Sequence, residues 1–239
     1  MKFVRLGFIF LFTFSIHSTP SLGLSAEDQT LFDKTKLKLL NRGDMIVRTL
    51  ERIGNQTIEL EAFVALETEL KMAGRIFSDF AQFETWAMPG INDRPSGGKY
   101  YVRILEIKSD AKDRITMKLA LTLPVFKRNV ICPFKLSTRT ERDVFTFRAD
   151  SIAQEGSIVH YARGTMKFFQ DSSNPHRLWV YLKGQVNLKH WILYETFPLP
   201  YIARETGDRI MIVMDNYLKE ESRIRSQSSS LAKGNGAKP

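Results

Sequence analysis

The chain has 239 residues, of which 43% are hydrophobic and 26% charged, and its formal net charge is +9. This composition is typical of a folded globular protein and excludes a wholly disordered chain, while the length permits one large domain or two small ones. The positive charge favours attraction to an anionic membrane surface. Nucleic acid is not expected as a partner, because the sequence has no dense block of lysine and arginine.

Residues 1–26 have the layout of a secretory signal peptide. Basic residues near the start precede an apolar run from Leu6 to Ile16, and small and polar residues follow it. The run is too short to span a bilayer, for which roughly 20 apolar residues are needed. We therefore expect cleavage after Gly23 or Ala26 and a mature protein that is exported, periplasmic or secreted. An uncleaved interfacial anchor is the alternative.

The first part of the mature chain is predicted to contain a helix, two strands and a helix pair. The helix is a lead-in over residues 27–43, and the strand candidates are Asp44–Arg52 and Thr57–Val64. Apolar residues recur at three- and four-residue steps over Glu67–Phe80, which indicates a helix. A second short helix, Ala81–Ala87, is stopped by the Pro-Gly pair that follows it.

From Tyr100 to Lys189 the hydrophobic pattern has a period of two residues. Alternating apolar residues in Ile115–Leu123 share one face, and turn-forming stretches separate the segments of this type. This pattern predicts an antiparallel meander with one buried face. Cys132 lies within it among apolar neighbours and is the only cysteine, so we expect a buried, unreactive thiol and no internal disulfide.

Polar residues of the meander suggest two further roles, each with a simpler alternative. Four arginines could hold a carboxylate or phosphate if they point inward, but alternation along the strands favours an outward direction: Arg139, Arg142, Arg148 and Arg163. His160 is either a solvent-facing histidine or a general base facing a cavity. The histidines that remain after the signal have no metal-ligand spacing, so no metal site and no catalytic motif is expected.

The pattern changes again after two closely spaced prolines near residue 200. Apolar residues that include Ile202, Ile210, Val213 and Tyr217 fall on one face of a long helix, which is predicted to be the lid of the core. Residues 227–239 are rich in serine, glycine and lysine and are predicted to be a disordered tail.

Four segments together resemble the START-like superfamily, which includes coenzyme-Q-binding and polyketide-cyclase-type proteins. They are LLNRGDMIVRTLER, LETELKMAGRIFSDFAQFETWAMPGI, HYARGTMKFF and PLPYIARETGDRIMIVMDNYL. The clearest match is the helix followed by Asp79-Phe80, Trp86 and Pro89, and the resemblance spans roughly residues 43–222. It implies a helix-grip fold, with two short helices at one end of a cavity.

The order of elements and this resemblance predict an α+β fold with a single domain over residues 27–226. We expect a curved antiparallel sheet of about six or seven strands wrapped against the long C-terminal helix, with two short helices after the first strand. A single helix lying across a strongly curved sheet need not fill the concave side, so a cavity between them is a natural consequence.

The helix ending Trp86-Ala87-Met88-Pro89 is predicted to close one end of this cavity, because the Pro-Gly pair ends the helix where it still presents large apolar side chains. Each of these residues could instead simply plug the end of the core. The candidate ligand-binding residues are Phe80, Trp86, Met88, Pro89, Tyr101, Phe147, Ile202, Ile210, Val213 and Tyr217.

The sequence thus favours an exported, monomeric binding protein for a hydrophobic small molecule, lipid or isoprenoid-like, with peripheral contact to anionic membrane and no cofactor. One alternative is a cyclase or aromatase acting on a polyketide-like substrate, which ionisable groups converging inside the pocket would favour. The other is an adaptor domain without a usable cavity.

Overall fold

The structure, a computed structural model, describes residues 24–42, 45–53, 57–95, 97–123, 126–155, 157, 159–189 and 199–234. The predicted signal peptide therefore lies outside the described residues, apart from its last three. Within the described part of the chain, no helix is both long enough and apolar enough to cross a bilayer.

The N-terminal part follows the sequence-based prediction closely. Helix α1 spans Ala26–Arg42, and the Ser25 hydroxyl accepts a hydrogen bond from the backbone N–H of Asp28 at 3.1 Å, which caps the helix start. Strands β1 (Met45–Ile53) and β2 (Thr57–Leu66) follow and pair antiparallel as a hairpin. The predicted lead-in helix and both predicted strands are confirmed.

Three short helical elements connect this hairpin to the meander: α2 (Leu70–Ser78), η1 (Phe80–Gln82) and α3 (Phe83–Ala87). The meander strands then follow as β3 (Val102–Ala111), β4 (Arg114–Leu123), β5 (Phe126–Glu141), β6 (Val144–Ser151), β7 (Val159–Asp171) and β8 (Asn174–Leu188). The chain then forms the long helix α5, Leu199–Gly234.

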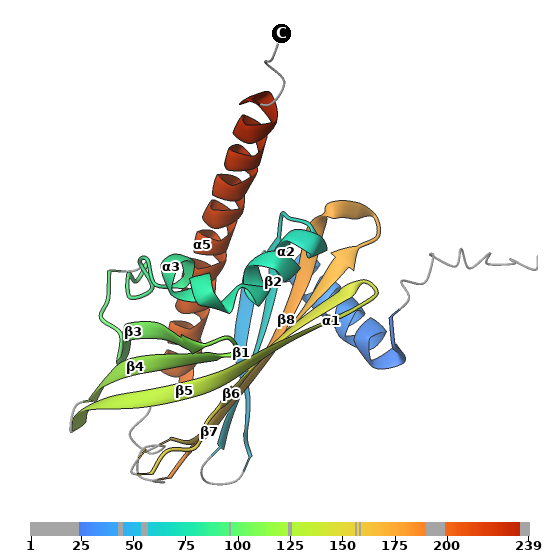
Figure 1. Cartoon of the computed structure of the whole chain (residues 1–239). Helices are drawn as coiled ribbons and strands as arrows, with labels where there is room; N and C mark the ends of the chain where they lie inside the picture. Colours follow the sequence, from blue (N-terminus) through green and yellow to red (C-terminus); the bar gives the residue numbers. More distant parts are fainter. Residues whose placement is uncertain are drawn as a thin grey trace, which may run out of the picture.

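The described strands form one antiparallel sheet of eight strands in the order β1-β2-β8-β7-β6-β5-β4-β3 (Figure 1). The α+β helix-grip layout predicted from the sequence is confirmed, with α5 lying against the sheet. The strand number is slightly higher than expected because the whole β1–β2 hairpin joins the sheet. Its β2 strand pairs with β8, which lies more than a hundred residues away in sequence, so the short helices follow the second strand.

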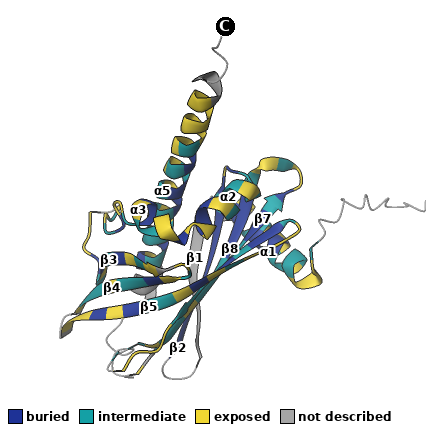
Figure 2. Ribbon diagram, viewed as in Figure 1, coloured by how far each residue is buried: buried dark blue, intermediate teal, exposed yellow. Residues whose placement is uncertain are grey.

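Helices pack on both faces of the sheet. We call the face against α2, α3 and α5 the inner face and the face against α1 the outer face (Figures 1 and 2). Leu178 and Val180 of β8 are buried in the inner cluster, whereas the alternating residues Trp179 and Tyr181 are buried in the outer one. The meander thus has two buried faces where α1 covers it, instead of the single buried face predicted.

Helix α5 continues further than the sequence suggests. Residues 227–234 are helical, so the predicted disordered tail is wrong for this stretch, and residues 235–239 lie outside the described residues. Serine hydroxyls in this part donate to carbonyls one turn earlier, Ser226 to Ser222 at 2.8 Å and Ser228 to Ile224 at 2.9 Å. Figure 1 shows this end of α5 projecting beyond the sheet.

Candidate ligand-binding face

One end of the inner face is filled by a tightly packed aromatic cluster. Phe77 of α2 lies at its centre, with ring centroids 5.2 Å from Trp86, 5.8 Å from Phe147, 5.0 Å from Phe168 and 5.1 Å from Tyr217. All five side chains are buried, and Phe77, Phe168 and Tyr217 are completely so. The interior of this end is therefore solid core that joins α2 and α3 to α5 and to the sheet. On its surface, between α3 and α5, Trp86 and Pro89 line a pocket of about 450 Å³.

The middle of the inner face is different, because a row of small residues crosses three strands there. Ala149 of β6 is paired with Gly164 of β7, which is paired with Gly184 of β8. A methyl group added at either glycine would meet nothing closer than a backbone oxygen at 4.0 Å. Neither glycine is required by a positive φ angle or by a close backbone approach. The space directly above this row of small residues is therefore open, and we call it the hollow.

Apolar side chains around this hollow are only partly buried, although they point to the inner face. They are Met117 and Leu119 on β4, Phe134 on β5, Met166 on β7, and Leu182 and Val186 on β8. Residues of the same strands nearer α2, such as Ile115, Phe168 and Val180, are fully buried. These apolar side chains thus stay partly exposed in this half of the inner face, although some of them pack against the inner cluster. Figure 2 colours residues of this class teal.

A smaller apolar cluster lies beyond the hollow, towards the opposite end of the strands. Its buried members are Ile58 and Leu60 of β2 and Val130 and Cys132 of β5, with the partly buried Tyr101 packed against them. Burial raises the pKa of the Cys132 thiol from 9.0 to about 11, which keeps it protonated and unreactive near neutral pH. The predicted buried thiol is confirmed.

A polar latch joins α5 to the edge strand β3 at the rim of the inner face. The buried Glu205 carboxylate accepts the backbone N–H groups of Tyr101 at 2.5 Å and of Val102 at 3.3 Å. Arg209, one turn later on α5, donates to the Val102 carbonyl, and its guanidinium lies 4.1 Å from the Tyr100 ring centroid. Burial lowers the pKa of Arg209, and the nearby Glu205 carboxylate opposes this shift.

The structure brings most of the predicted ligand-binding residues together, but mainly in the solid end of the core. Phe80, Trp86, Met88, Phe147, Ile210, Val213 and Tyr217 all belong to or pack against the inner cluster that contains Phe77. Tyr101 packs against the other cluster, Pro89 is exposed, and the side chain of Ile202 lies outside the described residues. Whether any of them contacts a ligand stays a prediction.

Sequence reasoning placed Phe77 on the apolar face of its helix but not among the candidate site residues, and it missed the small-residue row and the latch. Gly164 and Gly184 carry a visible signal, since glycine within an otherwise regular strand marks a special position. Their alignment in one row depends on strand register and could not be seen in the sequence. The latch has a weaker signal, a glutamate and an arginine four residues apart on a helix, which usually marks a solvent-exposed pair.

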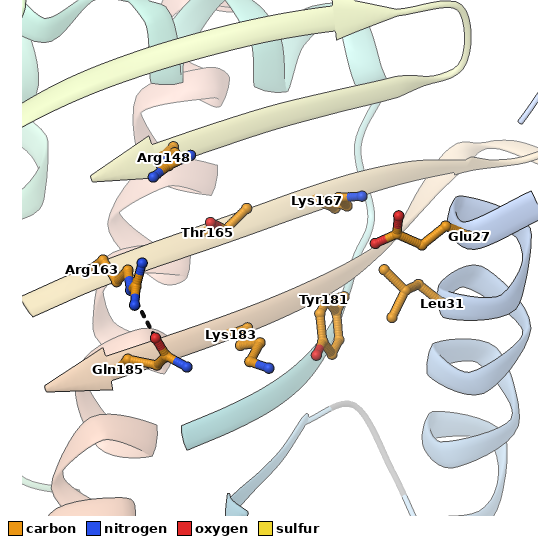
Figure 3. Close-up of a pocket in the computed structure, with 9 residues that line it drawn as sticks. All are labelled: Glu27, Leu31, Arg148, Arg163, Thr165, Lys167, Tyr181, Lys183 and Gln185. Carbon is orange, nitrogen blue, oxygen red and sulfur yellow. Dashed lines mark hydrogen bonds between the residues drawn. The ribbon is translucent and has the colours of Figure 1, made fainter. Parts of the chain in front are cut away.

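The arginines considered as inward-facing head-group ligands do not line the inner face. Arg148 and Arg163 line an outer-face pocket of about 450 Å³ (Figure 3). Arg139 is exposed, and Arg142 lies in the turn between β5 and β6 with a positive φ of 48°. The inward alternative is therefore wrong for Arg148 and Arg163, because the pleat directs both to the outer face. His160 is also exposed.

The outer-face pocket itself has largely compensated charge. It is lined by Glu27, Leu31, Arg148, Arg163, Thr165, Lys167, Tyr181, Lys183 and Gln185. Three of its cations pair with carboxylates: Arg148 with Asp150 at 2.6 Å, Lys167 with Asp28 at 2.5 Å and Lys183 with Glu59 at 2.8 Å. Arg163 donates to Gln185 at 2.7 Å, as the dashed line in Figure 3 shows. Of these contacts, Lys167–Asp28 joins α1 to β7, and Lys183–Glu59 joins β2 to β8.

Solved structures similar to this chain are START and helix-grip proteins. A STAR-related lipid transfer protein from Xanthomonas axonopodis is 14% identical, with 70% of this chain and 93% of that one covered and a TM-score of 0.41. An aromatase/cyclase from a Streptomyces species is 15% identical, with coverages of 70% and 94% and a TM-score of 0.41. Human STARD10 is 10% identical, with coverages of 89% and 88% and a TM-score of 0.45. No family model and no curated protein sequence matches the chain.

Proposed function

We propose that the protein binds a hydrophobic small molecule on the inner face of the sheet, beneath α5. The observation that carries this proposal is the hollow formed by Ala149, Gly164 and Gly184, surrounded by apolar side chains that remain partly exposed. A folded chain gains free energy by removing apolar surface from water. An apolar ligand seated in the hollow would remove the surface that the protein leaves uncovered.

The chemistry of the lining favours a flexible aliphatic ligand of the lipid or isoprenoid type. Met117 and Met166 are thioethers whose unbranched side chains adapt to irregular partners, and Leu119 and Val186 add aliphatic surface. The polar groups of the latch lie at the rim, where they are already paired with backbone. Apolar pockets with a few polar groups at one end are the usual form of small-molecule sites.

The hollow can be tested by filling it. Gly184→Leu places an apolar side chain into open space, so we expect loss of binding of a hydrophobic fluorescent probe with the free energy of unfolding unchanged or increased, since leucine is the better strand residue. Thr165→Leu is the matched control: it adds the same side chain on the neighbouring strand β7 but on the outer face. This control is expected to bind the probe like wild type.

Two outcomes would contradict the proposal. If wild-type protein stripped of bound lipid binds no hydrophobic probe, the protein is not a carrier of this kind. If Gly184→Leu binds the probe with wild-type affinity, the site lies elsewhere. Native mass spectrometry of protein purified from its own host identifies the ligand directly, and a hydroxylated aromatic product in place of a lipid would favour the cyclase alternative.

The protein is also proposed to act outside the cytoplasm, on the basis of the signal-like residues 1–23. Helix α1 begins at Ala26 and is capped by Ser25, and both residues lie within the predicted cleavage window. Cleavage after Gly23 keeps this cap, whereas cleavage after Ala26 would remove it. N-terminal sequencing of the native protein is expected to give Leu24, and an intact Met1 in the cytosolic fraction would contradict export.

A further inference from the structure

The outer face of strands β3, β4 and β5 carries a concentration of positive charge. Residues 102–135 contain eight lysines and arginines but only three acids. In the sheet register Arg103 is paired with Ala120, Lys118 with Ile131 and Lys127 with Thr122. These residues alternate along the strands with inward residues such as Leu119, Leu121 and Cys132, so the three cations lie on the outer face. All three cations are exposed. Helix α1 packs on β8, β2 and β1, so it does not cover this part of the sheet (Figure 1).

These three cations differ from the paired cations of the outer face, and Arg114 at the other end of β4 is a fourth exposed cation of the same kind. Neither Arg103, Lys118 nor Lys127 forms an ion pair with a residue that the structure describes. Their neighbours do: Lys108 pairs with Glu106 at 2.9 Å and Lys135 with Asp113 at 3.9 Å. The cations of the outer-face pocket are also mostly paired, as described above. Unpaired positive charge is therefore concentrated on the uncovered part of the sheet.

Apolar side chains lie among these cations and point into solvent. Ile131 of β5 is 50% exposed and sits directly beside Lys118 in the sheet register, and Leu105 of β3 is 40% exposed. We call Arg103, Leu105, Lys118, Lys127 and Ile131 the β3–β5 patch. Its combination of unpaired cations and exposed aliphatic groups on one uncovered sheet face calls for an explanation.

We propose that the β3–β5 patch docks the protein onto the surface of an anionic phospholipid bilayer. The cations meet the lipid head groups, and Leu105 and Ile131 enter the boundary between head groups and acyl chains. Protection of a sheet edge against aggregation accounts for charge on the edge strand β3 but not on β4 and β5, which lie inside the sheet. Nucleic acid fits less well, because aliphatic side chains gain little from contact with phosphate.

Vesicle binding tests the proposal. Wild-type protein is expected to sediment with vesicles of phosphatidylcholine containing about one third phosphatidylglycerol, and less with phosphatidylcholine alone or at high salt. The triple variant Arg103→Gln, Lys118→Gln, Lys127→Gln should bind the anionic vesicles about 100-fold more weakly, at about fivefold for each cation. The control, matched in net charge, removes three exposed cations of α2 and α5, Lys71→Gln, Arg75→Gln and Lys219→Gln, of which Lys219 is paired with Asp215. It should lose less than about threefold.

The apolar part is tested separately with Leu105→Ser and Ile131→Ser combined, which should weaken vesicle binding about tenfold at unchanged net charge. Thermal melts establish that each variant is folded. Equal losses in the two charge variants would show that net charge alone drives binding and would overturn the proposal. So would the absence of vesicle binding by wild type, or binding of single-stranded DNA through the patch without binding to vesicles.

This inference goes beyond ligand binding and can fail independently of it. The patch variants should bind the hydrophobic probe like wild type, because their changes lie on the outer face. Gly184→Leu should bind anionic vesicles like wild type, because its change lies on the inner face. Loss of only one of these two activities identifies which proposal is wrong.

Discussion

At the scale of single residues, the inner face contains the only thiol of the chain, which can report on its surroundings. Cys132 is the only cysteine, it is 5% exposed, and it lies in the apolar cluster next to the hollow. Burial favours the neutral thiol, so its pKa is raised from 9.0 to about 11. Because the chain has no second cysteine, the ionisation of this thiol can be followed with a thiol reagent without replacing any other residue.

We expect Cys132 to make stability pH-dependent in the alkaline range. Below about pH 9 the thiol is neutral in both the folded and the unfolded chain, so its contribution is fully present. As the pH rises from about 9 to about 11, only the unfolded chain ionises, and up to about 2 kcal/mol is lost. Urea unfolding of wild type and Cys132→Ala over this range checks the prediction; parallel pH profiles would contradict it.

Trp86 is the second residue whose role can be measured. Its ring packs 4.8 Å from Phe83 and 5.2 Å from Phe77, and its indole N–H is buried without a hydrogen-bond partner among the described residues. Trp86→Ala is therefore expected to cost about 3–5 kcal/mol in urea unfolding. Trp86→Phe keeps an aromatic ring and removes the unpaired donor, so it should cost less than about 1.5 kcal/mol.

The same Trp86→Phe protein, titrated with the hydrophobic probe, decides whether this residue lies at the ligand entrance, as the sequence predicts. Wild-type probe affinity in this folded variant would assign Trp86 to the core alone.

At the scale of elements, α5 is held to the sheet in two different ways. Met214 and Tyr217 are buried in the inner cluster, which fixes the middle of the helix by apolar packing. Nearer its start, Glu205 and Arg209 form hydrogen bonds with the backbone at the start of β3. Because β3 is an edge strand, these backbone groups have no neighbouring strand to pair with on that side. The two attachments predict different responses to mutation.

Removal of the latch should be costly. Glu205→Ala leaves two partly buried backbone N–H groups without an acceptor and the largely buried Arg209 without its carboxylate, so we expect a loss of about 3–5 kcal/mol in urea unfolding. Asp215→Ala on the same helix removes an exposed partner of Lys219 and should cost less than about 1 kcal/mol. Equal costs would show that the latch does not stabilise the fold.

The end of α5 should contribute little to stability. Residues 225–231 are all exposed, and Leu231 is 71% exposed. Deletion of residues 227–239 is expected to change the free energy of unfolding by less than about 0.5 kcal/mol, because surface changes away from packed features are usually of this size. A larger loss would mean that this part of the helix packs against another part of the chain.

At the scale of the whole molecule, the sheet separates two proposed activities. The inner face has the hollow with partly exposed apolar side chains around it, and the outer face has cations and aliphatic groups where α1 does not reach. A protein arranged in this way can contact a membrane with one face while a ligand is bound on the other. Substitutions that weaken ligand binding should therefore leave membrane binding unchanged, and the reverse should also hold.

Ligand binding should stabilise the whole domain. At a free ligand concentration of about 100 times Kd, the folded state gains about 2.7 kcal/mol, which corresponds to a rise in Tm of about 5–10 °C for a domain of this size. Gly184→Leu, with the hollow filled, should show no rise. A similar rise in both proteins would place the ligand outside the hollow.

Local pattern in the sequence was sufficient to predict the type and approximate bounds of the elements. Periods of two and three to four residues depend only on which side chains face a core, so the meander, the helix pair and the long helix could all be recognised. The apolar neighbours of Cys132 in the sequence indicated that it is buried, and it is. The resemblance added the helix-grip arrangement, and the structure has that layout.

Only the tertiary structure decided where the unfilled space lies and which faces are covered. Ala149, Gly164 and Gly184 form a row because of strand register, which pairs residues far apart in the chain. Glu205 meets Tyr101 across more than a hundred residues. Whether an outward strand residue is core or surface depended on the position of α1, which packs over β8 and β2. Among the helices that the structure describes, α1 is the one on this face, and it does not extend over β3–β5. These are long-range contacts, and a periodic pattern contains no information about its distant partner.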